Sequence, residues 1–107
     1  MSEHILRHVV LLSFKSAATQ EQVHEIERAF CALPAKIPAI RAFEWGADVS
    51  IEGASQGFSH CFIVTFVHED DRSAYLPHPA HQAFGALLQP CLEKVLVFDY
   101  WADAVAP

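Results

Sequence analysis

Residues 75 to 84, YLPHPAHQAF, place one phenol and two imidazoles around two prolines. Pro79 suits the first position of a helix, since its missing N–H leaves no hydrogen bond unmade there. His81 then falls in the first helical turn, where the positive helix end disfavours an imidazolium. A neutral imidazole can accept a proton, and Tyr75 can donate a hydrogen bond to a developing enolate oxygen. This spacing therefore predicts an acid–base pair suited to enolisation or aldol closure.

The same stretch also has a purely structural interpretation. His78 would cap the helix, while His81 would pack on the sheet and bond a backbone carbonyl. A metal site is a further alternative, because two histidines three residues apart share a helical face and His8, Glu44 or Asp99 could be a third ligand. No HExxH or CxxC spacing supports that alternative, so we expect no metal.

Two more histidines lie in apolar segments. His8 shares the parity of Val10 and Leu12 and is either a core residue or part of a pocket wall. His60 shares the parity of Phe62, which favours a structural role.

Acidic residues near the end of the chain have structural interpretations. Asp99 interrupts an apolar segment, and we expect it to pair with Arg7 or Arg41 or to bond backbone. The EDD run at 69–71 fits a solvated helix start.

The composition restricts the class of protein. The chain has 107 residues, is 52% apolar and carries a formal net charge of −6. We therefore expect one globular domain over residues 1–107. The negative charge and the absence of a Lys/Arg cluster argue against a nucleic-acid partner. Residues 1–14 are too short and too interrupted for a membrane span, and they lack a cleavage site, so neither a membrane partner nor export is expected.

Three cysteines, Cys31, Cys61 and Cys91, form no CxxC pair. An odd number without metal-type spacing indicates reduced, mostly buried thiols, which agrees with a cytoplasmic protein.

Periodicity predicts four strands and three helices, and it predicts their order. Thr19 and Gln22 form a possible capping box at the first helix, and Pro38 ends that helix. Pro77 separates a short acidic helix from a longer one. The expected elements are a strand at 5–14, a helix at about 20–36, a strand at 39–50 with Phe43, Trp45 and Val49 on one side, a loop at 51–57, a strand at 58–67, helices at 68–76 and 79–89, a strand at 93–101, and a tail at 102–107.

This order is the βαββαβ, ferredoxin-like pattern, an α+β fold with a four-stranded antiparallel sheet. Two helical segments cover only one face of such a sheet. The first, third and last strands nevertheless carry apolar residues on both faces, so the uncovered face would be a large apolar patch. We expect a second copy to bury it, sheet against sheet, in a two-fold homodimer.

Five segments carry a resemblance to a known family: HVVLLSFK, IPAIRAFEWGADVS, GFSHCFIVTFV, AYLPHPAHQAF and VLVFDY. The chain resembles the stress-responsive dimeric α/β-barrel family over residues 7 to 101. The Tyr-x-x-His-Pro-x-His block and the terminal Phe-Asp-Tyr are the most specific parts. The resemblance implies a homodimer whose two sheets form one barrel.

Activities differ within that family, and many members have no established role beyond induction under stress. A plant member closes a polyketo chain by aldol chemistry without a cofactor, and its catalytic pair matches Tyr75 and His81. The resemblance also gives His8, His60 and His78 histidine counterparts in that member. Where the member lines its pocket with aromatic residues of the first helix, this chain has Ile26, Glu27 and Phe30. The expected substrate-binding residues are His8, Val10, Leu12, Ile26, Phe30, Phe62 and His78.

Three functions remain open at this point. The first is a cofactor-independent cyclase or lyase acting on a small, partly apolar carbonyl or phenolic compound. The second is a stress-related binding or structural protein without turnover. The third is a haem- or oxygen-using monooxygenase like those among related dimeric barrels, although no residue stands out as an axial ligand. We expect no cofactor.

Overall fold

The computed structural model describes residues 4–103. Its element order confirms the predicted βαββαβ pattern, with each helical crossover divided into two pieces. The elements are β1 (Leu6–Phe14), α1 (Gln20–Cys31), α2 (Leu33–Lys36), β2 (Ala42–Ala47), β3 (His60–Phe66), α3 (Glu69–Tyr75), α4 (Pro79–Leu88), a 3₁₀ turn (Gln89–Cys91) and β4 (Leu92–Trp101). No helix in this part of the chain is long and apolar enough to cross a membrane.

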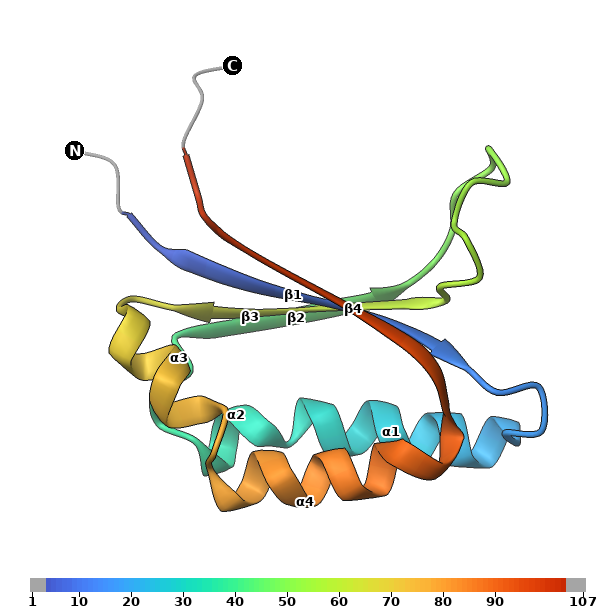
Figure 1. The fold of residues 1–107 in the computed structure, drawn as a ribbon, viewed down its shortest axis with the longest axis horizontal. Helices are drawn as coiled ribbons and strands as arrows, with labels where there is room; N and C mark the ends of the chain where they lie inside the picture. Colours follow the sequence, from blue (N-terminus) through green and yellow to red (C-terminus); the bar gives the residue numbers. More distant parts are fainter. Residues whose placement is uncertain (1–3, 104–107) are drawn as a thin grey trace.

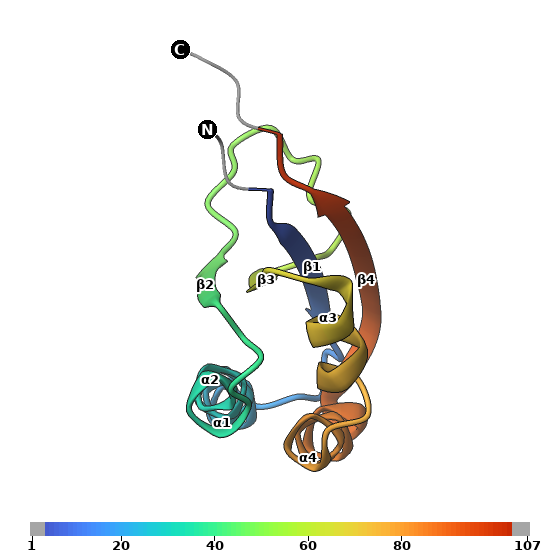
Figure 2. The same cartoon turned by 90° about the vertical axis from the view of Figure 1, so that its left-hand side faces the viewer.

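The four strands form one sheet in the order β2-β3-β1-β4, and every neighbouring pair is antiparallel. All helices lie on one side of this sheet, with α1 and α4 next to each other (Figure 1). The end-on view shows the same one-sided arrangement (Figure 2). The prediction of helices on a single face is therefore confirmed.

The pleat of β1 sorts its residues between the two faces. Leu6, His8, Val10 and Leu12 are buried, whereas the residues between them are only partly covered. Side chains at alternate positions share a face, so these four point toward the helices. Leu6, Val10 and Leu12 pack with residues of α1, α2, α4 and β3 to form one apolar core.

The opposite face of the sheet has no helix over it. Leu96, Phe98 and Tyr100 of β4 pair with the β1 residues that point away from the helices. They therefore lie on this outer face. Phe98 is 61% exposed, and Leu96 and Tyr100 are also exposed. The predicted uncovered apolar patch is thus present on the described chain.

The first predicted helix is divided. The capping box at Thr19 and Gln22 forms as expected, but α1 ends at Cys31 and a separate turn, α2, begins at Leu33. Pro34 explains the break, because proline lacks the N–H that a continuous helix needs and its ring clashes with the preceding turn. Ile37 precedes Pro38 in an extended conformation, which ends α2 as expected.

The second and third strands are shorter than predicted. Phe43 and Trp45 share a face in β2, but Val49 lies outside the strand and is 89% exposed. The Asp48 carboxylate accepts hydrogen bonds from the Ser50 N–H and the Ser55 hydroxyl. These bonds fold residues 48–55 into a turn and stop the ladder, a typical effect of Asp and Ser near strand ends.

The cysteines are all unpaired, but they differ in burial. Cys91 is buried, Cys61 is partly buried and Cys31 is exposed. The expectation that most of them would be buried is wrong, because only Cys91 is buried and Cys31 ends α1 at an exposed position.

Candidate active site

Three aromatic side chains from different elements meet at one end of the layer between helices and sheet. Tyr75 ends α3, His81 lies in the first turn of α4, and His8 lies on β1. The ring centres of Tyr75 and His81 are 4.4 Å apart, and those of Tyr75 and His8 are 5.7 Å apart. Residues separated by up to 73 positions are thus brought together, and they include the predicted acid–base pair.

The turn between α3 and α4 positions two of these residues. The Nδ1 atom of His78 accepts a hydrogen bond from the Ala80 N–H at 3.0 Å, so His78 caps α4. Pro79 occupies the first helical position, as predicted. The structural role considered for His78 is therefore present, and the capping bond occupies one of its ring nitrogens.

The ring of His81 is oriented by a backbone contact. Its Nδ1 atom lies 2.9 Å from the carbonyl oxygen of Leu76. A carbonyl can only accept, so Nδ1 carries the proton and the neutral ring keeps a lone pair on Nε2. The backbone bond that the structural interpretation predicted is consequently compatible with a ring that accepts a proton.

Burial lowers the pKa of His81 below its ordinary value of 6.5. The hydrogen bond to Leu76 raises this pKa, while the neighbouring His8 and His78 lower it. The direction of the His81 pKa shift agrees with the expectation, but its main cause is desolvation and not the helix end that the sequence suggested. His81 is predominantly neutral at pH 7.

The hydroxyl of Tyr75 is the most unusual group of this cluster. Tyr75 is fully buried, and within residues 4–103 its hydroxyl is the single buried side-chain polar atom without a hydrogen-bond partner. Burial raises the Tyr75 pKa well above its ordinary value of 10.0, so the hydroxyl remains a donor. An unsatisfied buried donor is rare in native proteins, and it can be satisfied by a ligand.

A carboxylate and a guanidinium lie next to this cluster in a contact that the sequence analysis did not predict. Asp99 of β4 lies directly across from His8 in the sheet, and its Oδ1 is 2.7 Å from Nδ1 of His8. Its Oδ2 accepts a hydrogen bond from Arg72 of α3 at 3.0 Å. The expected pairing of Asp99 with Arg7 or Arg41 is wrong. Arg7 lies on the outer face, where it donates to Thr65.

The sequence contained part of the information needed to predict the contact between His8 and Asp99. An acid inside the apolar segment VLVFDY is unusual, and so is a histidine inside HVVLLSF. Only the β1–β4 register shows that the two residues are opposite one another.

A second polar cluster occupies the other end of the helix–sheet layer. Nε2 of His60 lies 2.6 Å from a carboxylate oxygen of Glu27, and its Nδ1 lies 2.8 Å from the Ser59 hydroxyl. Trp45 stacks over the His60 ring with an interplanar angle of 2°. Both ring nitrogens are occupied, which agrees with the structural role expected for His60. The sequence analysis did not pair it with Glu27.

The predicted apolar substrate-binding residues form the core between these clusters. Phe30 stacks on Phe62 with ring centres 4.3 Å apart and also contacts Phe84 at 4.4 Å. The remaining three, Val10, Leu12 and Ile26, are buried in the same cluster.

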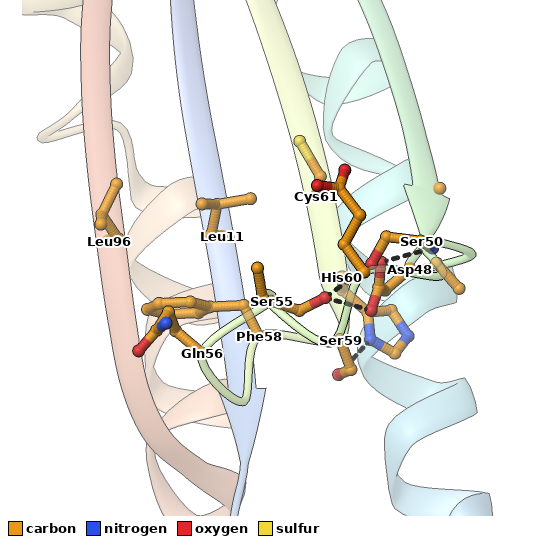
Figure 3. A pocket seen from close by; sticks show the side chains of 14 residues that line it. Leu11, Asp48, Ser50, Ser55, Gln56, Phe58, Ser59, His60, Cys61 and Leu96 are labelled. Carbon is orange, nitrogen blue, oxygen red and sulfur yellow. Dashed lines mark hydrogen bonds between the residues drawn. The ribbon is translucent and has the colours of Figure 1, made fainter.

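A cavity of about 630 Å³ lies elsewhere, on the helix-free face of the sheet. Figure 3 shows Leu11, Cys61 and Leu96 on neighbouring strands beside the loop that carries Ser55 and Phe58. Neither Tyr75 nor His81 lines this cavity. It belongs to the surface on which a second copy was predicted to pack.

No group of three or more His, Cys, Asp or Glu residues within residues 4–103 is arranged to bind a metal ion.

The sheet order and the one-sided helices define a ferredoxin-like α+β protein. Hydroxynitrile lyase from Passiflora edulis has the same fold: it is 27% identical with a TM-score of 0.89, and the match covers 99% of this chain and 100% of that one. A dimeric ferredoxin-like protein from Thermobifida fusca is 25% identical with a TM-score of 0.81, covering 95% and 94% of the two chains. Dimeric proteins are thus among its structural neighbours.

The chain belongs to the Stress responsive A/B Barrel Domain family, whose model matches residues 6–102. The Stress-response A/B barrel domain-containing protein HS1 of Arabidopsis thaliana is 39% identical over 101 residues, covering 94% of this chain and 93% of the relative. Olivetolic acid cyclase of Cannabis sativa is 35% identical over 95 residues, covering 89% and 94%. The resemblance inferred from the sequence motifs is confirmed.

Proposed function

We propose that this protein binds a small, partly apolar carbonyl or phenolic compound beside Tyr75 and catalyses proton transfer on it without a cofactor. The observation that carries the proposal is the buried Tyr75 hydroxyl without a hydrogen-bond partner, on a ring that lies against the imidazole rings of His8 and His81. The names of two similar proteins, a cyclase and a hydroxynitrile lyase, add support for an enzyme.

The proposed step uses groups whose protonation states follow from their contacts. Nε2 of His81 removes a proton from the carbon next to the substrate carbonyl. The Tyr75 hydroxyl donates a hydrogen bond to the enolate oxygen that develops. In an aldol closure the enolate carbon then attacks a second carbonyl, and the new alkoxide takes the proton back from the His81 imidazolium. The protein returns to its starting state, and no redox partner is consumed.

A ligand-observed NMR screen with β-diketones and phenolic acids tests this proposal. We expect binding to the wild type and weaker binding to Tyr75→Phe. For any compound that is turned over, His81→Ala should lower the rate on the order of 10²–10⁴-fold, the range for a lost general acid or base. His24→Ala is the matched control, since His24 is an exposed histidine on α1.

The densely filled core favours a second candidate function. Phe30 and Phe62 stack as buried residues of the core between the helices and the sheet, which fits a binding or structural protein without turnover. Binding that is lost in Tyr75→Phe without any product would support this candidate. Equal binding to the wild type and to both site variants would contradict a site at Tyr75.

We also propose that the protein is a homodimer formed through the outer face of the sheet. The exposed side chains of Leu96, Phe98 and Tyr100 and the dimeric structural neighbours support this assembly. Covering an apolar face of this kind is the usual reason for a two-fold sheet contact.

A further inference from the structure

The carboxylate of Asp99 connects two elements that flank the candidate site. Its Oδ1 contacts Nδ1 of His8 at 2.7 Å, and its Oδ2 contacts the Arg72 guanidinium at 3.0 Å. The His8 side chain is almost completely buried, whereas those of Asp99 and Arg72 are about a quarter exposed. Each carboxylate oxygen therefore has a different partner, one at the protein interior and one near the surface.

The contact with Asp99 determines which nitrogen of His8 carries the proton. A carboxylate only accepts hydrogen bonds, so Nδ1 of His8 must donate, and the neutral ring keeps a lone pair on Nε2. His81 has the same tautomer because its Nδ1 donates to the Leu76 carbonyl. In the neutral form of either imidazole that contacts the Tyr75 ring, Nε2 is thus the nitrogen without a proton.

Arg72 affects the tautomer of His8 indirectly, through its contact with Asp99. It binds the oxygen of Asp99 that does not face His8, and it fixes the rotation of the carboxylate on an edge strand. A residue that holds an acid against a histidine controls the tautomer of the ring, and loss of that control lowers the rate without changing the reacting groups.

We propose that Arg72 is a positioning residue, which directs Oδ1 of Asp99 to Nδ1 of His8 and so keeps Nε2 of His8 available as a second proton acceptor beside Tyr75. This inference rests on the proposed function of the same site. It also narrows the substrate class. The Tyr75 hydroxyl is one hydrogen-bond donor, and the Nε2 atoms of His8 and His81 are two proton acceptors, a set that matches a hydroxy-carbonyl compound or the enol of a 1,3-dicarbonyl.

The competing explanation is an ordinary surface ion pair between α3 and β4. Such pairs contribute little to stability, and their removal leaves the chemistry of a neighbouring ring unchanged. The histidine tautomer distinguishes the two explanations, because a merely structural ion pair would not change it.

Nitrogen-15 NMR of the His8 ring measures the tautomer directly and needs no substrate. The variants are Arg72→Met, which removes the charge and the donors, Arg72→Lys, which keeps the charge, and Asp99→Asn. Arg28→Met is the matched control, because Arg28 is an exposed arginine on α1. Arg72→Gln replaces Arg72→Met if the latter does not give a dispersed spectrum.

We expect His8 to be Nδ1-protonated in the wild type, in Arg28→Met and in Arg72→Lys. In Arg72→Met and Asp99→Asn the Nε2-protonated form should increase to a readily detected share. With a compound that is turned over, kcat of Arg72→Met should fall roughly 10-fold while KM stays nearly constant, the scale seen when an outer-shell partner is lost.

A wild-type tautomer in Arg72→Met would overturn the proposal, whether or not the protein turns over a substrate. An altered tautomer without turnover of any compound would support the positioning role and contradict the proposed enzyme. The two inferences can therefore fail independently.

Discussion

At the scale of single residues, Tyr75 has the clearest conflict between stability and function. Its ring packs against Phe66, His8 and His81, but its hydroxyl has left water without gaining a hydrogen bond. Such burial costs about 1–3 kcal/mol. A phenylalanine would fill the same space without this penalty, so the hydroxyl contributes nothing to the fold that would explain its presence.

Replacing Tyr75 with Phe should therefore separate folding from binding. We expect the free energy of unfolding to stay the same or to rise by about 1 kcal/mol, because an unsatisfied group is removed. Binding of the carbonyl ligand should weaken at the same time. Urea denaturation and ligand-observed NMR measure the two effects, with His24→Ala at an exposed position of α1 as control. A marked loss of stability would show that the hydroxyl has a structural partner.

The lowered pKa of His81 makes stability depend on pH in a defined direction. Because the folded-state pKa lies below the ordinary 6.5, the unfolded chain binds more protons as the pH falls. The contribution of neutral His81 to the free energy of unfolding is complete above about pH 6.5, and it is lost as the pH falls toward the folded-state pKa. Urea denaturation between pH 5 and 8 should show the wild-type advantage over His81→Asn shrinking on acidification. An advantage that grows on acidification would contradict the burial argument.

At the scale of secondary-structure elements, the two-proline turn determines where α4 begins. Pro77 follows the C-cap residue of α3, and Pro79 starts α4, so the loop between them has little freedom. The His78 ring satisfies one N–H of the first turn of α4. Since His81 lies in this turn, the cap also supports the ring beside Tyr75.

Removing the cap should affect both stability and the site. His78→Ala should cost about 1 kcal/mol of unfolding free energy, the usual value of a lost N-cap. His78→Asn, which can accept the same hydrogen bond, should recover most of this loss. Thermal or urea denaturation measures both variants. If Ala and Asn are equally destabilised, the ring contributes by packing and not by capping.

At the scale of the whole molecule, the sheet has one covered and one uncovered face. The core lies between the sheet and α1, α2 and α4, while the outer face has apolar side chains exposed on β4. Apolar area of this kind is stable in water only when it is covered or small.

Introducing a charge on this face should therefore give a monomer. In a two-fold dimer Phe98→Glu places two carboxylates in the interface, which should bury more than roughly 1,000 Å². Sedimentation equilibrium at micromolar concentration should show a dimer for the wild type and a monomer for Phe98→Glu. Val49→Glu is the control, since Val49 is exposed in the loop after β2. A wild-type monomer would rule out the proposed assembly.

The divided first helix and the early end of β2 show where local patterns were insufficient. Ile26, Phe30, Leu33 and Ile37 keep helical spacing and are all buried, so the apolar period continues across the break at Pro34. Hydrophobic periodicity reports which side faces the core, but it does not report whether the backbone hydrogen bonds are continuous. The turn at Asp48 likewise depends on side-chain bonds to Ser50 and Ser55 that a period cannot reveal.

The sequence by itself determined the order of strands and helices, the two-sided apolar strands and the start of α4 at Pro79, because these depend on periodicity and on local backbone chemistry. It also identified Tyr75 and His81 as the residues with the most suitable chemistry. Only the tertiary structure decided that Asp99 pairs with His8 and Arg72, and that Glu27 pairs with His60. The physical reason is that these contacts join residues 27 to 91 positions apart, so they depend on strand register and on where each helix lies against the sheet.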